Sequence, residues 1–141
     1  MPISSPFPKI TRRAALLGAA AALMFAAALP AHDARADDTV KLGLVAALSG
    51  QSAKSGEAIT RGITLAIDKI NAEGGVLGKP LELVSRDDES NPGKGLVAAR
   101  ELAQRERVAA LIGGLDTPVS LAIVPFANQQ KIPFVGPWAA G

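Results

Sequence analysis

The feature that most constrains the fold of this chain is an alternation, from residue 40 onward, between short apolar segments and longer segments with helical periodicity. The strand-length segments are residues 40–47, 80–86, 108–112 and 132–135. The first is apolar on both faces, which is typical of a strand covered by helices on either side. Strands that alternate with helices of this length form parallel βαβ units with right-handed crossovers. The alternation therefore predicts an α/β fold, a doubly wound parallel sheet built from Rossmann-like βα repeats.

The first helix is predicted to begin at Glu57, because apolar residues recur from there at intervals of three and four. It follows a loop, residues 48–56, that is rich in Ser and Gly. The pair Gly74-Gly75 ends this helix, since glycine adopts the left-handed conformation of a helix C-terminus without a steric penalty.

Two further helix starts carry the same signal, a capping residue followed by a proline. Asn91-Pro92 precedes a helix over residues 93–106, and Thr117-Pro118 opens a helix that runs to about residue 130. We expect Asn91 and Thr117 to be the N-caps. Each predicted helix therefore lies between two predicted strands.

The first 36 residues have the pattern of an export signal: a basic start at Lys9, Arg12 and Arg13, an apolar run over residues 14–29, and the cleavage site Ala34-Arg35-Ala36. Cleavage there would leave residues 37–141 in the periplasm. The apolar run is shorter than the roughly 20 residues that span a bilayer, and no transmembrane segment is expected in the mature chain. The arginine pair fits either the Sec or the twin-arginine route.

Composition then excludes several classes of protein. The signal holds four of the 15 basic and one of the 13 acidic residues, so its removal changes the formal net charge from +2 to −1. A mature chain without a basic excess lacks the electrostatic footprint of a nucleic-acid-binding protein. The single His, His32, lies in the signal, and there is no Cys or Tyr. We therefore expect neither an enzyme nor a metal or cofactor site.

Ligands of open parallel sheets bind beyond the carboxyl ends of the strands. There, Gly113 and Gly114 permit close backbone approach, and a helix start at Thr117 offers N–H groups and a partial positive charge to a carboxylate, with the hydroxyls of Thr117 and Ser120. The same residues also fit a simple helix cap after a strand-to-helix turn, and Asp116 would repel an anion. Both interpretations stay open.

Three other segments carry candidate groups, each with a structural alternative. The side chains of Ser49, Gln51, Ser52 and Ser55 can bond a ligand or be solvated surface. Trp138 either walls a pocket or packs as a plug against further parts of the fold. The run Asp87-Asp88-Glu89 is either a carboxylate cluster for a metal or acid/base chemistry, or a solvated loop.

Three motifs resemble those of the leucine/isoleucine/valine-binding family of periplasmic substrate-binding proteins. They are Leu48-Ser49-Gly50 with Gly56, the segment RGITLAIDKINAEGGVLG at 61–78, and RDDESNP at 86–92. The resemblance implies a type I periplasmic binding fold of two lobes, of which residues 37–141 form a truncated amino-terminal lobe. It implies uptake of a small amino acid or related carboxylate or amide, with an inner-membrane ABC permease and its ATPase subunits as partners. The alternative is the ligand-sensing domain of a receptor or amide regulator with the same fold.

The same resemblance implies a set of ligand-binding residues. In it, the loop after the third strand meets the ligand α-carboxylate, with Thr117 in the place of a ligand-binding Ser. Two positions depart from the family pattern: Ala140 stands where amino-acid binders often have a Thr, and Trp138 is bulky where a small residue is common. An aromatic acid or an amide is therefore an alternative ligand. The implied set is Ser55, Leu115, Asp116, Thr117, Trp138, Ala139 and Ala140.

Overall fold

Four strands and three helices alternate along residues 39–139, the part of the chain that this computed structural model describes. The predicted export signal and Ala140 lie outside the described residues. No helix within residues 39–139 is long and apolar enough to cross a membrane. In chain order the elements are β1 (Val40–Ala46), α2 (Ala53–Ala72), β2 (Leu81–Asp87), α3 (Pro92–Gln104), β3 (Ala110–Gly113), α4 (Thr117–Gln130) and β4 (Phe134–Val135).

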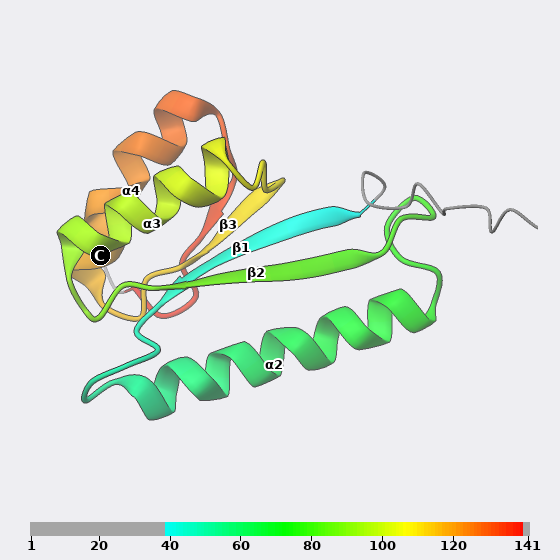
Figure 1. The fold of residues 1–141 in the computed structure, drawn as a ribbon, viewed down its shortest axis with the longest axis horizontal. Coiled ribbons are helices and arrows are strands. Elements are labelled where there is room, and N and C mark those ends of the chain that lie inside the picture. The colour runs from blue at the N-terminus through cyan, green and yellow to red at the C-terminus, as the bar shows by residue number, and fades with distance from the viewer. Residues whose placement is uncertain (1–38, 140–141) are drawn as a thin grey trace, which may run out of the picture. The chain divides into compact units, whose positions relative to one another are not determined.

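The strands form one parallel sheet in the order β2-β1-β3-β4 (Figure 1). Val40 pairs with Leu81, and Leu42 pairs with Ala110, so β1 lies between β2 and β3. The chain moves outward from β1 to β2 and then returns to the other side of β1. The order reverses there, and such a switch point is where open α/β sheets bind ligands. The predicted doubly wound parallel sheet is confirmed.

Helices cover both faces of the sheet, with α2 on one side and α3 and α4 on the other (Figure 1). Successive β1 residues point to opposite faces. Leu44 and Ala46 pack with Ile59 of α2, whereas Val45 belongs to a larger core formed with α3 and α4. These β1 residues are at most 1% exposed. The strand is thus buried on both faces, as its continuous apolar sequence predicted.

The prediction that the first helix begins at Glu57 is wrong, because α2 begins at Ala53. Gly56 lies in its first turn, and a Cβ built there would be 2.0 Å from the carbonyl oxygen of Ala47. Only glycine permits this approach between the helix start and the end of β1. The Ser- and Gly-rich composition that indicated a loop is therefore partly a packing requirement of the helix.

The two prolines start helices as expected, but only one predicted cap is correct. The Asn91 side chain accepts a hydrogen bond from the Lys94 N–H at 3.0 Å, which confirms it as the N-cap of α3. In α4 the N-cap is Asp116, and Thr117 is the first helical residue. Asp116 makes no side-chain capping bond. The assignment of Thr117 as N-cap is therefore wrong by one position.

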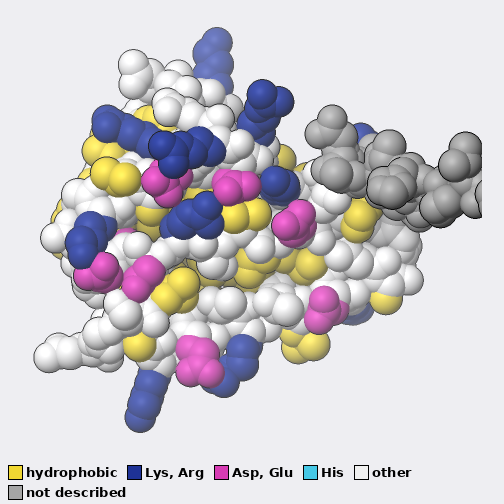
Figure 2. All heavy atoms as spheres, in the orientation of Figure 1, with side chains coloured by type: hydrophobic (Ala, Val, Ile, Leu, Met, Phe, Trp, Pro, Cys, Tyr) yellow, Lys and Arg dark blue, Asp and Glu magenta, His cyan; other side chains and the backbone are white. Residues whose placement is uncertain are grey.

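Basic and acidic side chains are interspersed on the face shown in Figure 2. One network joins three elements: Glu106, just beyond α3, lies 3.3 Å from Lys41 Nζ of β1 and 2.9 Å from Arg86 Nη2 of β2. The hydrogen bond from Lys41, assisted by Arg86, lowers the pKa of Glu106. Because the three side chains are about one-third exposed, this network contributes to the positions of the elements more than to the free energy of folding.

Candidate functional site

A pocket of about 330 Å³ opens at the carboxyl ends of β1 and β3, and three of the predicted site residues line it. Ser55 comes from the first turn of α2, Leu115 from the turn after β3, and Trp138 from the segment after β4. Ala58 and Ile59 of α2 complete the lining. The volume suits a small ligand. Residues that are far apart in sequence are thus brought together at the switch point of the sheet.

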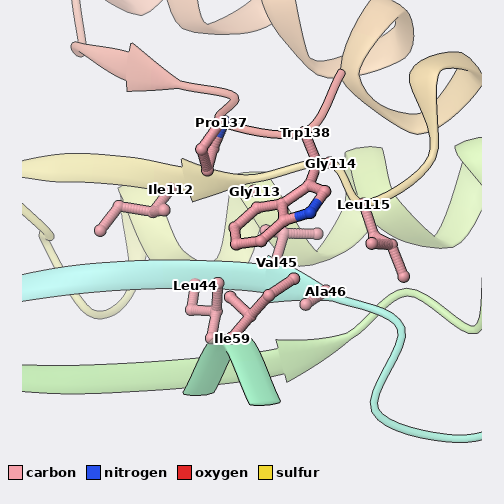
Figure 3. Close-up of a pocket in the computed structure, with 10 residues that line it drawn as sticks. All are labelled: Leu44, Val45, Ala46, Ile59, Ile112, Gly113, Gly114, Leu115, Pro137 and Trp138. Atoms are coloured by element: carbon pink, nitrogen blue, oxygen red, sulfur yellow. The ribbon is translucent and has the colours of Figure 1, made fainter. Parts of the chain in front are cut away.

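Trp138 forms one wall of this pocket. Figure 3 shows its indole ring pointing from the segment after β4 toward β1 and Ile59. A narrow cavity beneath the ring shares Ile59, Leu115 and Trp138 with the pocket. Trp138 is nevertheless 57% exposed, so much of the ring faces away from the protein in the described part of the chain. This geometry favours the pocket-wall interpretation, which stays a prediction.

The start of α4 lies beside the pocket but does not line it. Thr117 is half-buried in its first turn. The N–H groups of Val119 and Ser120 donate to the Asp116 carbonyl at 3.0 and 3.2 Å, whereas those of Leu115 and Asp116 have no backbone acceptor within residues 39–139. The donors that remain near the pocket are therefore those of the turn that precedes the helix.

Ser120 does not present its hydroxyl to a ligand, contrary to the expectation from sequence. Its side chain is 4% exposed, and its hydroxyl donates to the Gly114 carbonyl at 3.4 Å. Gly114 has φ +75°, and a Cβ there would lie 1.5 Å from Ser120 Oγ. A Cβ at Gly113 would lie 2.5 Å from the Val45 carbonyl oxygen. The space beside both glycines is thus filled by the protein, which favours the strand-to-helix turn interpretation.

Asp87 ties the loop after β1 to the end of β2. Its carboxylate accepts hydrogen bonds from the N–H groups of Leu48 and Glu89, both at 2.9 Å. A further hydrogen bond from the Ser49 side chain is the main cause that lowers the pKa of Asp87, with the backbone bonds adding to it against the opposing effect of burial. Ser49, a candidate ligand donor from sequence, therefore serves this structural tie.

Asp88 is 1% exposed, so the solvated-loop interpretation of the acidic run is wrong for this residue. Its Oδ1 accepts from the Ser90 N–H at 2.8 Å, and its Oδ2 is buried with no hydrogen-bond partner among the described residues. Burial raises the pKa of Asp88, and the charges of Asp116 and Asp87 raise it further against the Ser90 bond. Glu89, by contrast, forms an exposed ion pair with Lys94.

The alternation of side chains along β2 is the sequence signal that could have predicted the burial of Asp88. Side chains alternate between the two faces of a strand, and Asp88 lies four residues after Val84, so both are expected on the same face. Val84 packs against the core under α3 and α4. Arg86 is expected on that face too and reaches Glu101 of α3. Within residues 39–139, no three acidic or histidine side chains are grouped so that they could hold a metal ion. The three acidic residues therefore have different roles: Asp87 links two loops, Asp88 is buried, and Glu89 forms an ion pair at the surface.

Comparison with known proteins places this geometry in a family. Residues 39–141 match the family model described as periplasmic binding protein. The Leu/Ile/Val-binding protein homolog 7 of Brucella abortus is 32% identical over 108 residues, which cover 77% of this chain and 27% of that protein. The chain thus spans little more than a quarter of this relative.

Two solved structures show the same fold with ligands bound. The branched-chain amino acid transporter substrate binding protein LivJ from Streptococcus pneumoniae, in complex with isoleucine, is 32% identical with a TM-score of 0.70, covering 73% of this chain and 30% of that one. A solute binding protein of an ABC transporter from Rhodopseudomonas palustris BisB5, in complex with 3,4-dihydroxybenzoic acid, is 35% identical with a TM-score of 0.64, covering 70% and 26%. The chain belongs to the periplasmic binding protein family, and within it is similar to Leu/Ile/Val-binding proteins.

Proposed function

We propose that this chain belongs to the periplasmic solute-binding component of an ABC importer of the branched-chain-amino-acid type, and that it captures a small carboxylate ligand for uptake. The observation that carries the proposal is the pocket of about 330 Å³ at the switch point of the sheet, lined by Ser55, Leu115 and Trp138. Two similar proteins are described with isoleucine and with 3,4-dihydroxybenzoic acid. An amino acid and an aromatic acid are therefore the two ligand classes to compare.

The carboxylate of the ligand would meet the turn before α4. The N–H groups of Leu115 and Asp116, the side chain of Thr117 and the positive end of the α4 dipole favour an anion there. The apolar part of the ligand would then lie against Ile59 and Trp138. An aromatic ring stacked on the indole gains about 0.5–1.5 kcal/mol beyond its buried area, so Trp138 favours an aromatic acid over isoleucine.

Binding without chemical conversion is what the pocket lining supports. Among its residues, Ser55 supplies a hydroxyl and the others are apolar. A hydroxyl becomes a nucleophile only beside a base, and the five described residues that line the pocket include no acid, histidine, lysine or arginine. Release of the unchanged ligand to a permease with ATPase subunits in the inner membrane follows from the proposed role. Without the second lobe that the family resemblance implies, a ligand would stay largely exposed to water, and we expect residues 37–141 alone to bind no better than millimolar, about −4 kcal/mol.

Calorimetric titration of isoleucine and 3,4-dihydroxybenzoate into a full two-lobed form of the protein, purified from the periplasm, tests the proposal. Saturable binding that changes Trp138 fluorescence is the expected result. Thr117→Ala should weaken binding by about 1–3 kcal/mol through loss of a charge-assisted hydrogen bond, whereas Ser85→Ala in β2 should not. Trp138→Ala should weaken 3,4-dihydroxybenzoate more than isoleucine. If neither compound binds, the proposed ligand class is wrong.

A further inference from the structure

Asp88 is held in place by its backbone at the point where β1, β2 and α3 meet. Its N–H donates to the Ala46 carbonyl at 3.0 Å, and its carbonyl accepts from the Asn91 N–H at 2.8 Å. The first bond ties it to the end of β1, and the second ties it to the N-cap of α3. These bonds fix the backbone of Asp88 at a position where the residue is 1% exposed.

Helices α3 and α4 close tightly over this side chain. A Cβ added at Gly95 of α3 would lie 2.5 Å from Val119 Cγ1 of α4 and 3.6 Å from Asp88 Cβ. Asp88 thus lies beneath the contact between the two helices, beside apolar groups. An ionised carboxylate is costly to bury in such surroundings unless each oxygen is hydrogen-bonded, and Oδ2 has no partner among residues 39–139.

The charged groups around Asp88 do little to offset the cost of burying its ionised carboxylate. Asp87 precedes it in the chain, and Asp116, at the N-cap of α4, has its own buried Oδ2 with no hydrogen-bond partner among residues 39–139. The basic side chains of the adjoining β2 and α3 are engaged elsewhere. Arg86 pairs with Glu101 and Glu106, Lys94 pairs with Glu89, and Arg100 lies over the Phe126 ring, 5.9 Å from its centroid.

Protonation of Asp88 removes most of this cost, because a neutral carboxyl group is far less costly to bury than an ion. Burial, followed by the Asp116 and Asp87 charges, raises the pKa of Asp88, in agreement with the geometry. Asp116 also belongs to the turn where the ligand carboxylate is proposed to bind. The charge state of Asp88 therefore acts on the same helix start as an anionic ligand.

We propose that Asp88 is a proton-binding switch beneath the N-terminus of α4: its protonated form favours binding of an anionic ligand, and its ionised form weakens it. The ligand part of this inference rests on the proposed function, whereas retention of the proton does not. One additional negative charge near a partly desolvated anion site lowers affinity by roughly tenfold. Affinity should fall as the pH rises through the ionisation of Asp88.

Carboxyl ¹³C NMR of the aspartate-labelled protein tests the proton directly. The Asp88 resonance should titrate at a higher pH than an ordinary aspartate. Asp116→Asn should move this midpoint to lower pH by removing a like charge, whereas Asp68→Asn, on the exposed side of α2, should not move it. An Asp88 midpoint at the ordinary value, or one unaffected by Asp116→Asn, would overturn the proposed switch.

Titration of 3,4-dihydroxybenzoate as a function of pH tests the effect on binding. Affinity of the parent protein should fall about tenfold across the Asp88 midpoint, and Asp88→Asn should bind with the same affinity on both sides of it. An equal pH dependence in parent and variant would refute control by Asp88. If the parent binds no carboxylate at any pH, the proposed function and the ligand role of the switch both fail, while the NMR titration still decides whether Asp88 retains its proton.

The stability of Asp88→Asn supplies a readout that does not depend on a ligand. A group with a raised pKa in the folded state contributes stability at low pH that is lost as the pH rises through that pKa. The variant, whose amide cannot ionise, should therefore gain stability relative to the parent as the pH rises through the Asp88 midpoint measured by NMR. A difference in stability that stays constant on both sides of that midpoint would contradict the retained proton.

Discussion

Gly56 offers a sharp test of how the helix α2 is seated on the sheet. Its Cα lies so close to β1 that an added Cβ would stand 2.0 Å from the Ala47 carbonyl oxygen and 2.8 Å from the carbonyl carbon. Both atoms belong to the backbone, so no side-chain rotation can relieve the overlap. The Gly56→Ala variant must shift the start of α2 away from the end of β1.

A second glycine in the same helix provides a matched control. A Cβ at Gly62 would meet nothing within 4 Å. Alanine stabilises a helix interior by roughly 0.5–1 kcal/mol over glycine, so Gly62→Ala should be slightly stabilising. The same gain applies at Gly56, but overpacking costs about 1–3 kcal/mol, and more when backbone atoms collide. We expect Gly56→Ala to be destabilised relative to Gly62→Ala by about 2–3 kcal/mol.

Urea unfolding of both variants, followed by circular dichroism at 222 nm, measures this difference. The shift of α2 should also displace Ser55 and Ile59, which line the pocket, and so weaken binding of 3,4-dihydroxybenzoate in Gly56→Ala alone. Two variants of equal stability would refute the argument that Gly56 is required by the close contact with Ala47.

Three further predictions concern the core, the Asp87 tie and processing. Leu102→Ala, at a fully buried position of α3, should lose about 2–5 kcal/mol of unfolding free energy, whereas Leu65→Ala, 72% exposed on α2, should lose little; equal losses would contradict the assigned core. Because the pKa of Asp87 is lowered, its stabilising effect is present above the unfolded pKa and is lost as the pH falls through the folded value. Asp87→Asn should therefore be about 1 kcal/mol less stable at pH 7 and nearly equal to the parent in acid; a deficit that persists in acid would count against the charged tie. N-terminal sequencing of the exported protein should begin at Asp37, and retention of the first 36 residues would disprove the cleavage site.

Much of the architecture could be predicted from sequence because its signals are local. A strand buried on both faces needs apolar residues at consecutive positions, as residues 40–47 show, and a helix start needs a cap such as Asn91 before its proline. The alternation of these signals, with the known handedness of crossovers, was sufficient for a parallel, doubly wound sheet. The motif resemblance to the family rests on the same local information and is confirmed.

Part of the candidate site could also be predicted, since the carboxyl ends of parallel strands meet at one edge. Ser55, Leu115 and Trp138 were each expected near a ligand, and the structure places them around one pocket. Their ligand contacts stay predictions. Ala139 lies next to Trp138, and Ala140 lies outside the described residues.

Tertiary structure alone decided which polar groups are free and which are used internally. The partner of a hydroxyl or carboxyl group comes from a segment that is distant in sequence, so composition does not reveal it. The side chain of Ser49 forms a hydrogen bond with Asp87 from another loop, and the hydroxyl of Ser120 donates a hydrogen bond to the Gly114 carbonyl. Asp88 is buried because α3 and α4 meet above it, and its neighbours in sequence are exposed or half-exposed. Local periodicity determined the elements of this protein, whereas long-range packing determined the charge and availability of the groups at its site.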